Sequence, residues 1–116
     1  SLFSTDLKAW EKTVFSCAKV KELVEALEAM GRRQIVLCGM ESHVCVYQTA
    51  RDFRAMGYDV IVAQDAVCSR TDENRKIGLD LMAGEGAVLS CTESILFDWL
   101  GAAGGAQFKA ISALVK

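Results

Sequence analysis

Apolar residues along the chain switch between the spacing of a helix and the spacing of a strand. In residues 18–30 they recur at intervals of three and four, which places them on one face of a helix. Ser16 is suited to cap the start of this helix, and Gly31 is suited to end it. Residues 35–38, IVLC, then form a continuous apolar run rich in β-branched side chains, which Gly39 ends. Such a run predicts a strand covered on both faces.

The same alternation continues to the end of the chain. Residues 43–56 predict a helix whose buried stripe is Val46, Ala50 and Phe53. Residues 59–65 and 87–90 predict two further strands. Helices are predicted over residues 72–83, the run ILFDWL and residues 107–115. Each predicted strand is therefore separated from the next by a helix.

Two of these helices carry more specific signals. In the helix predicted after the second strand, the apolar side consists of Ile77, Leu81 and Met82. Ahead of the run ILFDWL, Ser90 and Glu93 have the S-x-x-E spacing of a capping box. This spacing predicts that a helix begins at Ser90.

Alternating helices and strands predict an α/β fold. Strands separated by helices run parallel, so we expect a three-layer, Rossmann-like parallel sheet with helices on both faces. The glycine- and alanine-rich residues 101–105 are the one candidate linker, and they are too short to separate domains. Residues 1–116 are therefore expected to belong to one domain.

Composition narrows the possible partners. The chain is 52% apolar with a net charge of −2, and it has no basic run or basic-aromatic patch, so we expect no nucleic-acid partner. Its apolar runs are far shorter than a membrane-spanning helix, so we expect no membrane partner either. Because the chain has no G-x-G-x-x-G motif and no P-loop, no cofactor is expected. We expect a cytoplasmic protein, with the mitochondrion as the alternative compartment.

Five cysteines and one histidine are the residues with the most distinctive chemistry. No two cysteines form a C-x-x-C pair, and one histidine offers little to a zinc site, so we expect no metal. Cys45 is considered separately, because it follows the predicted strand IVLC near the start of the next helix. The others are expected to be reduced, buried and apolar in character: Cys17, Cys38, Cys68 and Cys91.

The position of Cys45 suits a nucleophile. Ligands of open α/β sheets bind beyond the carboxyl ends of the strands. There the positive end of a helix favours a thiolate, backbone N–H groups can hold an oxyanion, and a sharp turn exposes the side chain. A thiol also needs an activating group. His43 is one candidate, although a spacing of two residues does not suit a hydrogen bond to Cys45, and an upstream lysine with a carboxylate is another.

Several motifs along the chain point to one family. G-M-E-S-H-V-C-V, residues 39–46, contains Cys45, and E-K-T-V-F-S occupies residues 11–16. Residues 57–70 combine a strand with a D-A-x-x-S-R turn, and the chain ends in Q-F-K-A-I-S-A-L-V-K. In this order the motifs resemble those of the isochorismatase-like cysteine hydrolases, most closely the isochorismatase domain-containing group.

The resemblance implies a catalytic site. It matches Cys45 to the nucleophile and Lys12 to the catalytic lysine. It also implies a cis peptide bond between Met40 and Glu41, which would aim the backbone N–H groups of Glu41 and Cys45 at an oxyanion. The implied activity is hydrolysis of a small amide or related carbonyl compound, through a Cys thiolate and a thioester. The resemblance also implies a homo-oligomer, and it does not identify the small-molecule substrate.

The family's catalytic aspartate has no match in this sequence. It ends the family's first strand, far upstream of the lysine, and Asp6 stands in no comparable motif. The family's sheet has the strand order 3-2-1-4-5-6, so this chain would hold only the end of strand 3 and strands 4–6. We therefore expect the C-terminal portion of an isochorismatase-like hydrolase domain whose N-terminal part is missing, with an exposed edge on strand 4.

Two other functions stay open. A chain with this fold but without the aspartate would serve as a scaffold or an oligomer-forming subunit, with apolar surface around Trp99 and Phe108 as the contact. Cys45 could instead be a redox-sensing thiol. A carboxylate near Cys45 and Lys12 would distinguish the enzyme from the scaffold, and turnover would distinguish the enzyme from the sensor.

Overall fold

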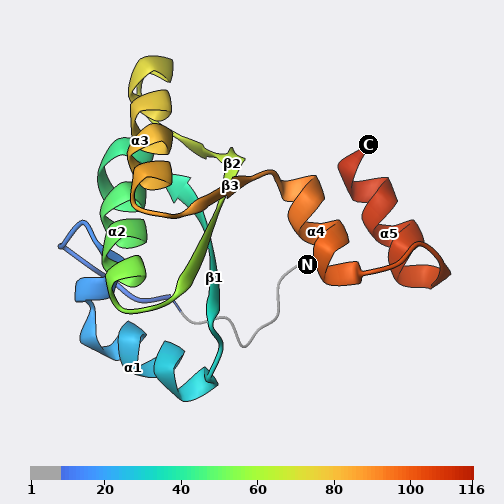
Figure 1. Cartoon of the computed structure of the whole chain (residues 1–116), viewed down its shortest axis with the longest axis horizontal. Helices are drawn as coiled ribbons and strands as arrows, with labels where there is room; N and C mark the ends of the chain where they lie inside the picture. The colour runs from blue at the N-terminus through green and yellow to red at the C-terminus, as the bar shows by residue number, and fades with distance from the viewer. Residues whose placement is uncertain (1–8) are drawn as a thin grey trace.

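Helices and strands alternate along the chain, as the apolar spacing predicts (Figure 1). The computed structural model describes residues 9–116. The elements in chain order are η1 (Cys17–Lys19), α1 (Lys21–Met30), β1 (Gln34–Met40), η2 (Ser42–Val46), α2 (Tyr47–Ala55), β2 (Asp59–Cys68), α3 (Asp72–Gly84), β3 (Val88–Ser90), α4 (Thr92–Leu100) and α5 (Gly105–Val115).

The three strands form a parallel sheet in the order β1-β2-β3. Ile35 pairs with Val60, and Ile61 pairs with Val88. The helices α2 and α3 pack on one face of the sheet and α4 lies on the other (Figure 1). α2 connects β1 to β2, and α3 connects β2 to β3, so both connections step across the sheet in the same direction. Because connections between parallel strands have the same handedness, α2 and α3 lie on the same face. The predicted three-layer α/β fold is confirmed.

The core lies between the sheet and the pair α2–α3. The predicted stripe of Val46, Ala50 and Phe53 is buried there, at 5%, 0% and 1% exposure. Val60 and Val62 of β2 meet it from the sheet. Ile35 and Leu37 of β1 also pack against this layer, so the strand and α2 share the same packed residues.

The first predicted helix is divided in two. Ser16 accepts a hydrogen bond from Ala18 N at the start of the short helix η1, and Val20 is extended before α1 begins. Gly31 ends α1 with a φ of 67°, in the left-handed conformation that glycine adopts most easily. The family resemblance implied that the chain holds the end of the family's strand 3. Residues 9–16, which include Lys12, contain no strand.

β1 does not end at Gly39 as the sequence predicted. The strand continues to Met40 through an irregularity between Leu37 and Gly39, where the pairing register with β2 shifts. Gly39 has a φ of 104°, so its lack of a Cβ permits the bulge. The strand is also not fully covered on both faces, because none of its residues is fully buried and its last three are exposed.

The prediction that four cysteines are buried was wrong. Cys38 and Cys68 are exposed near the carboxyl ends of β1 and β2, and the other cysteines are half-buried. Apolar residue type alone does not bury a side chain when its strand lies at an edge or extends beyond the packed layer.

The buried face of α3 also differs from the prediction. Ile77 and Leu81 are 45% and 42% exposed, and of the three predicted residues only Met82 is buried. Gly78 and Leu79 complete the buried face. A Cβ on Gly78 would lie 2.6 Å from His43 N, so the glycine allows α3 to approach η2 more closely than a larger residue would.

The predicted capping box at Ser90 and Glu93 is wrong. α4 begins at Thr92, and its cap comes from β2, where Asp65 Oδ1 accepts hydrogen bonds from Thr92 N at 2.8 Å and Thr92 Oγ1 at 3.0 Å. These bonds, chiefly the backbone one, hold the pKa of Asp65 below its usual value. A residue distant in sequence therefore caps this helix.

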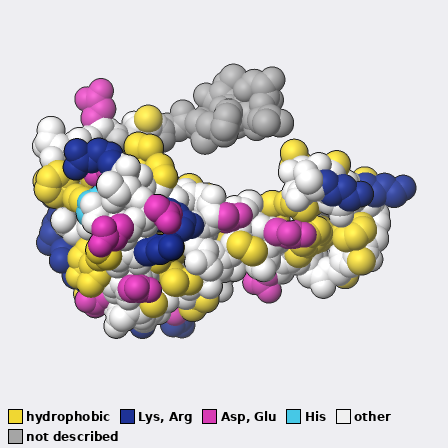
Figure 2. All heavy atoms as spheres, turned by 90° about the horizontal axis from the view of Figure 1, so that it is seen from above, with side chains coloured by type: hydrophobic (Ala, Val, Ile, Leu, Met, Phe, Trp, Pro, Cys, Tyr) yellow, Lys and Arg dark blue, Asp and Glu magenta, His cyan; other side chains and the backbone are white. Residues whose placement is uncertain are grey.

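The last two helices extend away from the sheet (Figure 1). α5 packs against α4 through Phe97 and Phe108, whose ring centroids are 6.0 Å apart. Trp99 of α4 is 61% exposed. Figure 2 shows apolar side chains on the surface of this part of the molecule, so one expected contact residue is exposed and the other packs within the pair.

Candidate active site

Cys45 lies in a compact turn between β1 and α2. The peptide bond between Met40 and Glu41 is cis, at the position where the family resemblance places it. The chain then enters η2, a π-helical turn that contains Cys45, and the side chain of Cys45 is half-buried. Glu41 O accepts hydrogen bonds from Val44 N at 3.2 Å and from Val46 N at 3.1 Å.

Hydrogen bonds from several backbone N–H groups organise this turn. Ser42 N donates to Ser69 Oγ, and Val44 N and Val46 N donate to Glu41 O. Tyr47 N, directly after η2, donates to Ser42 O and Val44 O. The resemblance implies the N–H groups of Glu41 and Cys45 for an oxyanion, and Cys45 lies within η2.

A small pocket brings Cys45 and Lys12 together. It has a volume of about 90 Å³, and its lining consists of Lys12, Cys17, Leu37, Cys38, Met40, Cys45, Val46 and Thr49. Lys12 Nζ donates to Val14 O at 3.1 Å and to Phe15 O at 3.0 Å, within the K-T-x-F-S segment. The segment therefore holds its own lysine through two carbonyl groups, and this lysine lines the same pocket as Cys45.

No aspartate or glutamate lines this pocket in residues 9–116. Asp6 lies outside the described residues. Within residues 9–116, no three His, Cys, Asp or Glu side chains are placed to hold a metal ion. A larger cavity of about 550 Å³ lies at the opposite end of β1, beside Arg32, Arg33 and Trp99, and its lining among residues 9–116 includes no nucleophile.

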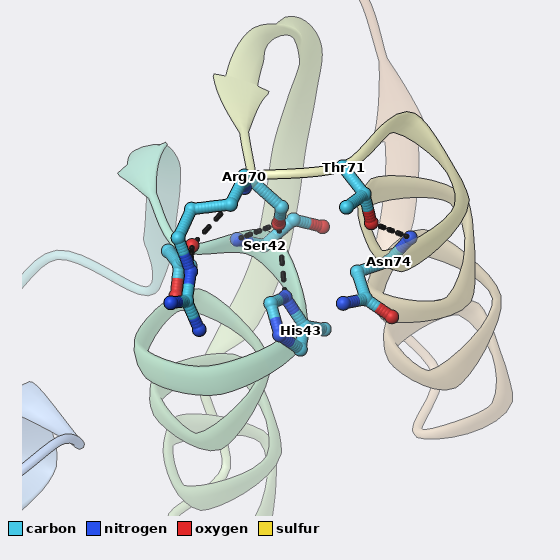
Figure 3. A network of polar contacts seen from close by, with 7 residues as sticks. Ser42, His43, Arg70, Thr71 and Asn74 are labelled. Atoms are coloured by element: carbon cyan, nitrogen blue, oxygen red, sulfur yellow. Dashed lines mark hydrogen bonds and ion pairs between the residues drawn. The ribbon is translucent and has the colours of Figure 1, made fainter.

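His43 contacts the neighbouring turn. Its Nδ1 atom lies 3.0 Å from Ser69 Oγ, the same oxygen that accepts from Ser42 N at 3.0 Å (Figure 3). Its ring is therefore engaged by Ser69, which supports the structural interpretation of this histidine over a role as the base for Cys45.

A second link joins the same two turns. Glu41 Oε1 accepts from Arg70 N at 3.1 Å and from Arg70 Nε at 3.2 Å. The side chain of Glu41 is 26% exposed and that of Arg70 is 86% exposed, so the pair closes the turn on its solvent side. In the sequence Ser69 and Arg70 stand out only as part of a motif, because their partners are 26 to 29 residues away.

Helix α3 packs against the turn that contains Cys45. Ser42 is completely buried, and its Oγ donates to Arg75 O at 2.9 Å. Gly78 provides the space for this contact, as described above. The backbone around Cys45 is therefore held by the β2–α3 turn on one side and by α3 on another.

Comparison with known proteins identifies the family. The model of the isochorismatase domain matches residues 5–94 of the chain. The chain belongs to the isochorismatase family. Two curated relatives are a secreted isochorismatase effector, Isc1, of Phytophthora sojae and isochorismatase domain-containing protein 2 of Xenopus laevis. They are 41% and 38% identical over 96% and 98% of the chain, which covers 53% and 56% of them. The resemblance to the domain-containing group is confirmed.

Solved structures of the isochorismatase family share the fold. A MAR1 ribonuclease of Caenorhabditis elegans superposes with a TM-score of 0.78 at 33% identity, over 90% of this chain and 53% of that one. A pyrazinamidase/nicotinamidase of Streptococcus mutans superposes with a TM-score of 0.64 at 31% identity, over 68% and 44%. The chain thus spans about half the length of the relatives it matches. No helix within residues 9–116 has the length and apolar character needed to cross a membrane.

Proposed function

We propose that this isochorismatase-family chain contributes the nucleophile of a cysteine hydrolase that acts on a small amide or related carbonyl compound. The observation that carries the proposal is the turn around Cys45. Cys45 and Lys12 line the same pocket, and hydrogen bonds from Ser42 N, Val44 N and Val46 N hold the backbone between Glu41 and Cys45. A thiol, a cation and two backbone donors are the groups that acyl transfer requires.

The reaction would proceed in two stages. The Cys45 thiolate attacks the carbonyl carbon, and the N–H groups of Glu41 and Cys45 stabilise the oxyanion. A carboxylate takes the thiol proton and passes it to the leaving amine, and Lys12 stabilises the charged pair. Water then hydrolyses the thioester, which releases the acid and restores the thiol.

The carboxylate is expected outside residues 9–116. No acidic side chain lines the pocket in this part of the chain. We propose that it comes from a part of the protein N-terminal to the portion seen here, in keeping with relatives about twice as long. The pyrazinamidase/nicotinamidase neighbour is an amidase by its name, which supports an amide substrate.

Alkylation of the native protein tests this proposal. Iodoacetamide is applied between pH 5 and 9, and labelling of each cysteine is followed by mass spectrometry. We expect Cys45 to react fast below pH 7 while the other four cysteines lag, because an ordinary thiol becomes reactive only toward its usual pKa of about 8.5. An unreactive Cys45, or one that behaves like an ordinary thiol, would favour the scaffold interpretation.

One observation favours redox sensing as a second candidate function. Cys17, Cys38 and Cys45 line the same small pocket. A peroxide would oxidise the Cys45 thiolate to a sulfenic acid, and a neighbouring thiol would then form a disulfide with it and release water. Peptide mapping under non-reducing conditions after peroxide treatment checks this candidate. A reducible link from Cys45 to Cys17 or Cys38 supports it, and irreversible oxidation of Cys45 without a link contradicts it.

A further inference from the structure

Ser69 makes the contact that joins the two turns beside the candidate active site. Its hydroxyl accepts a hydrogen bond from Ser42 N at 3.0 Å and lies 3.0 Å from His43 Nδ1. A hydroxyl has one proton and two acceptor sites, so it can accept from Ser42 N–H while it donates to the ring of a neutral His43. One side chain from the end of β2 therefore orients two consecutive residues ahead of Cys45.

The Ser42 contact determines which way the backbone of the turn faces. Ser42 is the residue directly after Glu41, so a bond that holds Ser42 N–H toward Ser69 also limits rotation of the peptide that carries it. Ser42 is completely buried, so its N–H group has no access to water as an alternative partner. Loss of the Ser69 hydroxyl would therefore make the turn rearrange.

Arg70 holds the side chain of Glu41, the residue before Ser42. Its backbone N and its Nε both donate to Glu41 Oε1. Met40 is paired with Cys68 in the sheet, so Ser69 and Arg70 directly follow the last paired residue and lie close to Glu41 and Ser42. Figure 3 shows Arg70, Ser42 and His43 in this network of polar contacts.

We propose that Ser69, supported by Arg70, is a positioning residue that holds the Glu41–Cys45 turn in the conformation needed to bind an oxyanion. This inference rests on the proposed function. Ser69 touches neither the thiol nor the substrate in this scheme. It acts through Ser42 and His43 on the direction of the backbone donors, and a displacement of about 1 Å there costs up to about 10²-fold in rate.

Two reagents separate the orientation of the donors from the reactivity of the thiol. Iodoacetamide alkylates a thiolate by direct displacement and forms no oxyanion. p-Nitrophenyl acetate acylates the same thiol through a tetrahedral oxyanion and releases p-nitrophenolate. The ratio of acylation rate to alkylation rate at Cys45 therefore reports on oxyanion stabilisation, independently of how much thiolate is present.

The experiment measures this ratio in the intact protein and its variants. For Ser69→Ala we expect acylation to fall about tenfold or more, while alkylation stays within about twofold. Ser69→Thr keeps the hydroxyl and should restore the ratio. Thr71→Ala is the matched control, because it removes a hydroxyl from the same segment that only caps α3 through Asn74 N. An unchanged ratio in Ser69→Ala, or an equal fall in Thr71→Ala, would overturn the proposal.

A second variant decides the question if Ser69→Ala does not fold. Arg70 is 86% exposed at its side chain, so Arg70→Ala should fold normally. The proposal then requires a lowered ratio in Arg70→Ala and a normal ratio in Ser69→Thr, and any other combination contradicts it. If the unmodified protein is alkylated but never acylated at Cys45, the proposed hydrolase function fails instead, which distinguishes the two failures.

Discussion

At the scale of single residues, Gly78 controls how closely α3 approaches the turn around Cys45. A Cβ at this position would lie 2.6 Å from His43 N, a backbone atom that cannot move freely. We expect Gly78→Ala to lower the free energy of unfolding by about 1–3 kcal/mol, because added volume in a packed contact causes strain. Chemical denaturation measures this change.

Gly84 provides the matched control on the same helix. A Cβ there would have no atom within 4 Å, and Gly84 is the last residue of α3. Gly84→Ala should raise the free energy of unfolding by about 0.4–1 kcal/mol, since alanine restricts the unfolded chain. Equal effects of the two substitutions would show that the close contact at Gly78 does not matter.

Lys12 is the second residue-scale test. It lines the pocket with Cys45, and its ammonium is held by two carbonyl groups of its own segment. A cation near a thiol favours the thiolate, so Lys12→Met should slow alkylation of Cys45 at pH 6 by about tenfold. Lys21→Met is the control, because Lys21 lies on α1 with an 89% exposed side chain. A rate unchanged in Lys12→Met would remove this lysine from the proposed mechanism.

At the scale of elements, Asp65 links β2 to the start of α4. Its folded pKa lies below the ordinary 3.8, first of all because Thr92 N donates to it. The stabilisation is therefore present above pH 3.8 and is lost as the pH falls through the lowered folded value. We expect the melting temperature of the unmodified protein to drop across this acidic range.

Two variants of Asp65 separate its charge from its cap. Asp65→Asn keeps an acceptor oxygen but has no charge, so its melting temperature should vary less with acidity. Asp65→Ala removes the cap and should melt lower than Asp65→Asn at pH 7. Melting curves between pH 2 and 7 record both effects. Identical pH profiles for all three proteins would rule out this coupling.

Helix α2 depends on Phe53 for its packing against the sheet. Phe53 is 1% exposed, and its ring meets Tyr58 edge to face with centroids 5.5 Å apart. Phe53→Ala should lower the free energy of unfolding by about 3–5 kcal/mol, because it removes buried apolar surface and leaves a cavity. Phe15→Ala, at a residue 57% exposed, should change it by about 0.5 kcal/mol or less. Urea denaturation of the pair tests the assignment of the core.

At the scale of the whole molecule, the unpaired edge of β1 affects how the chain associates with other copies. β1 is an edge of the described sheet, and an unpaired strand edge invites association with another strand. We expect the 116-residue chain alone to self-associate through β1, and Val36→Lys to reduce this association in sedimentation velocity. Val88→Lys, on the edge strand β3, is the control. Equal loss of association in both variants would argue against β1 as the contact.

Local patterns in the sequence were enough to predict the order of the elements and the parallel sheet. Helices and strands of this length have apolar periods that are read within about ten residues, so residues such as Val46, Ala50 and Phe53 could be assigned to the core. The position of Cys45 between a strand and a helix was also a local property. The comparisons then confirmed the family that the motifs suggested.

Contacts between distant segments were decided only by the tertiary structure. Asp65 replaces the expected capping box because β2 ends beside the start of α4, and Gly78 is buried because α3 lies against Ser42. Ser69 reaches Ser42 across 27 residues. The sequence alone determined which segments form helices and strands, because that depends on neighbours in the chain. Which side chains meet at the turn around Cys45 depends on how those segments pack, and only the folded chain brings them within hydrogen-bonding distance.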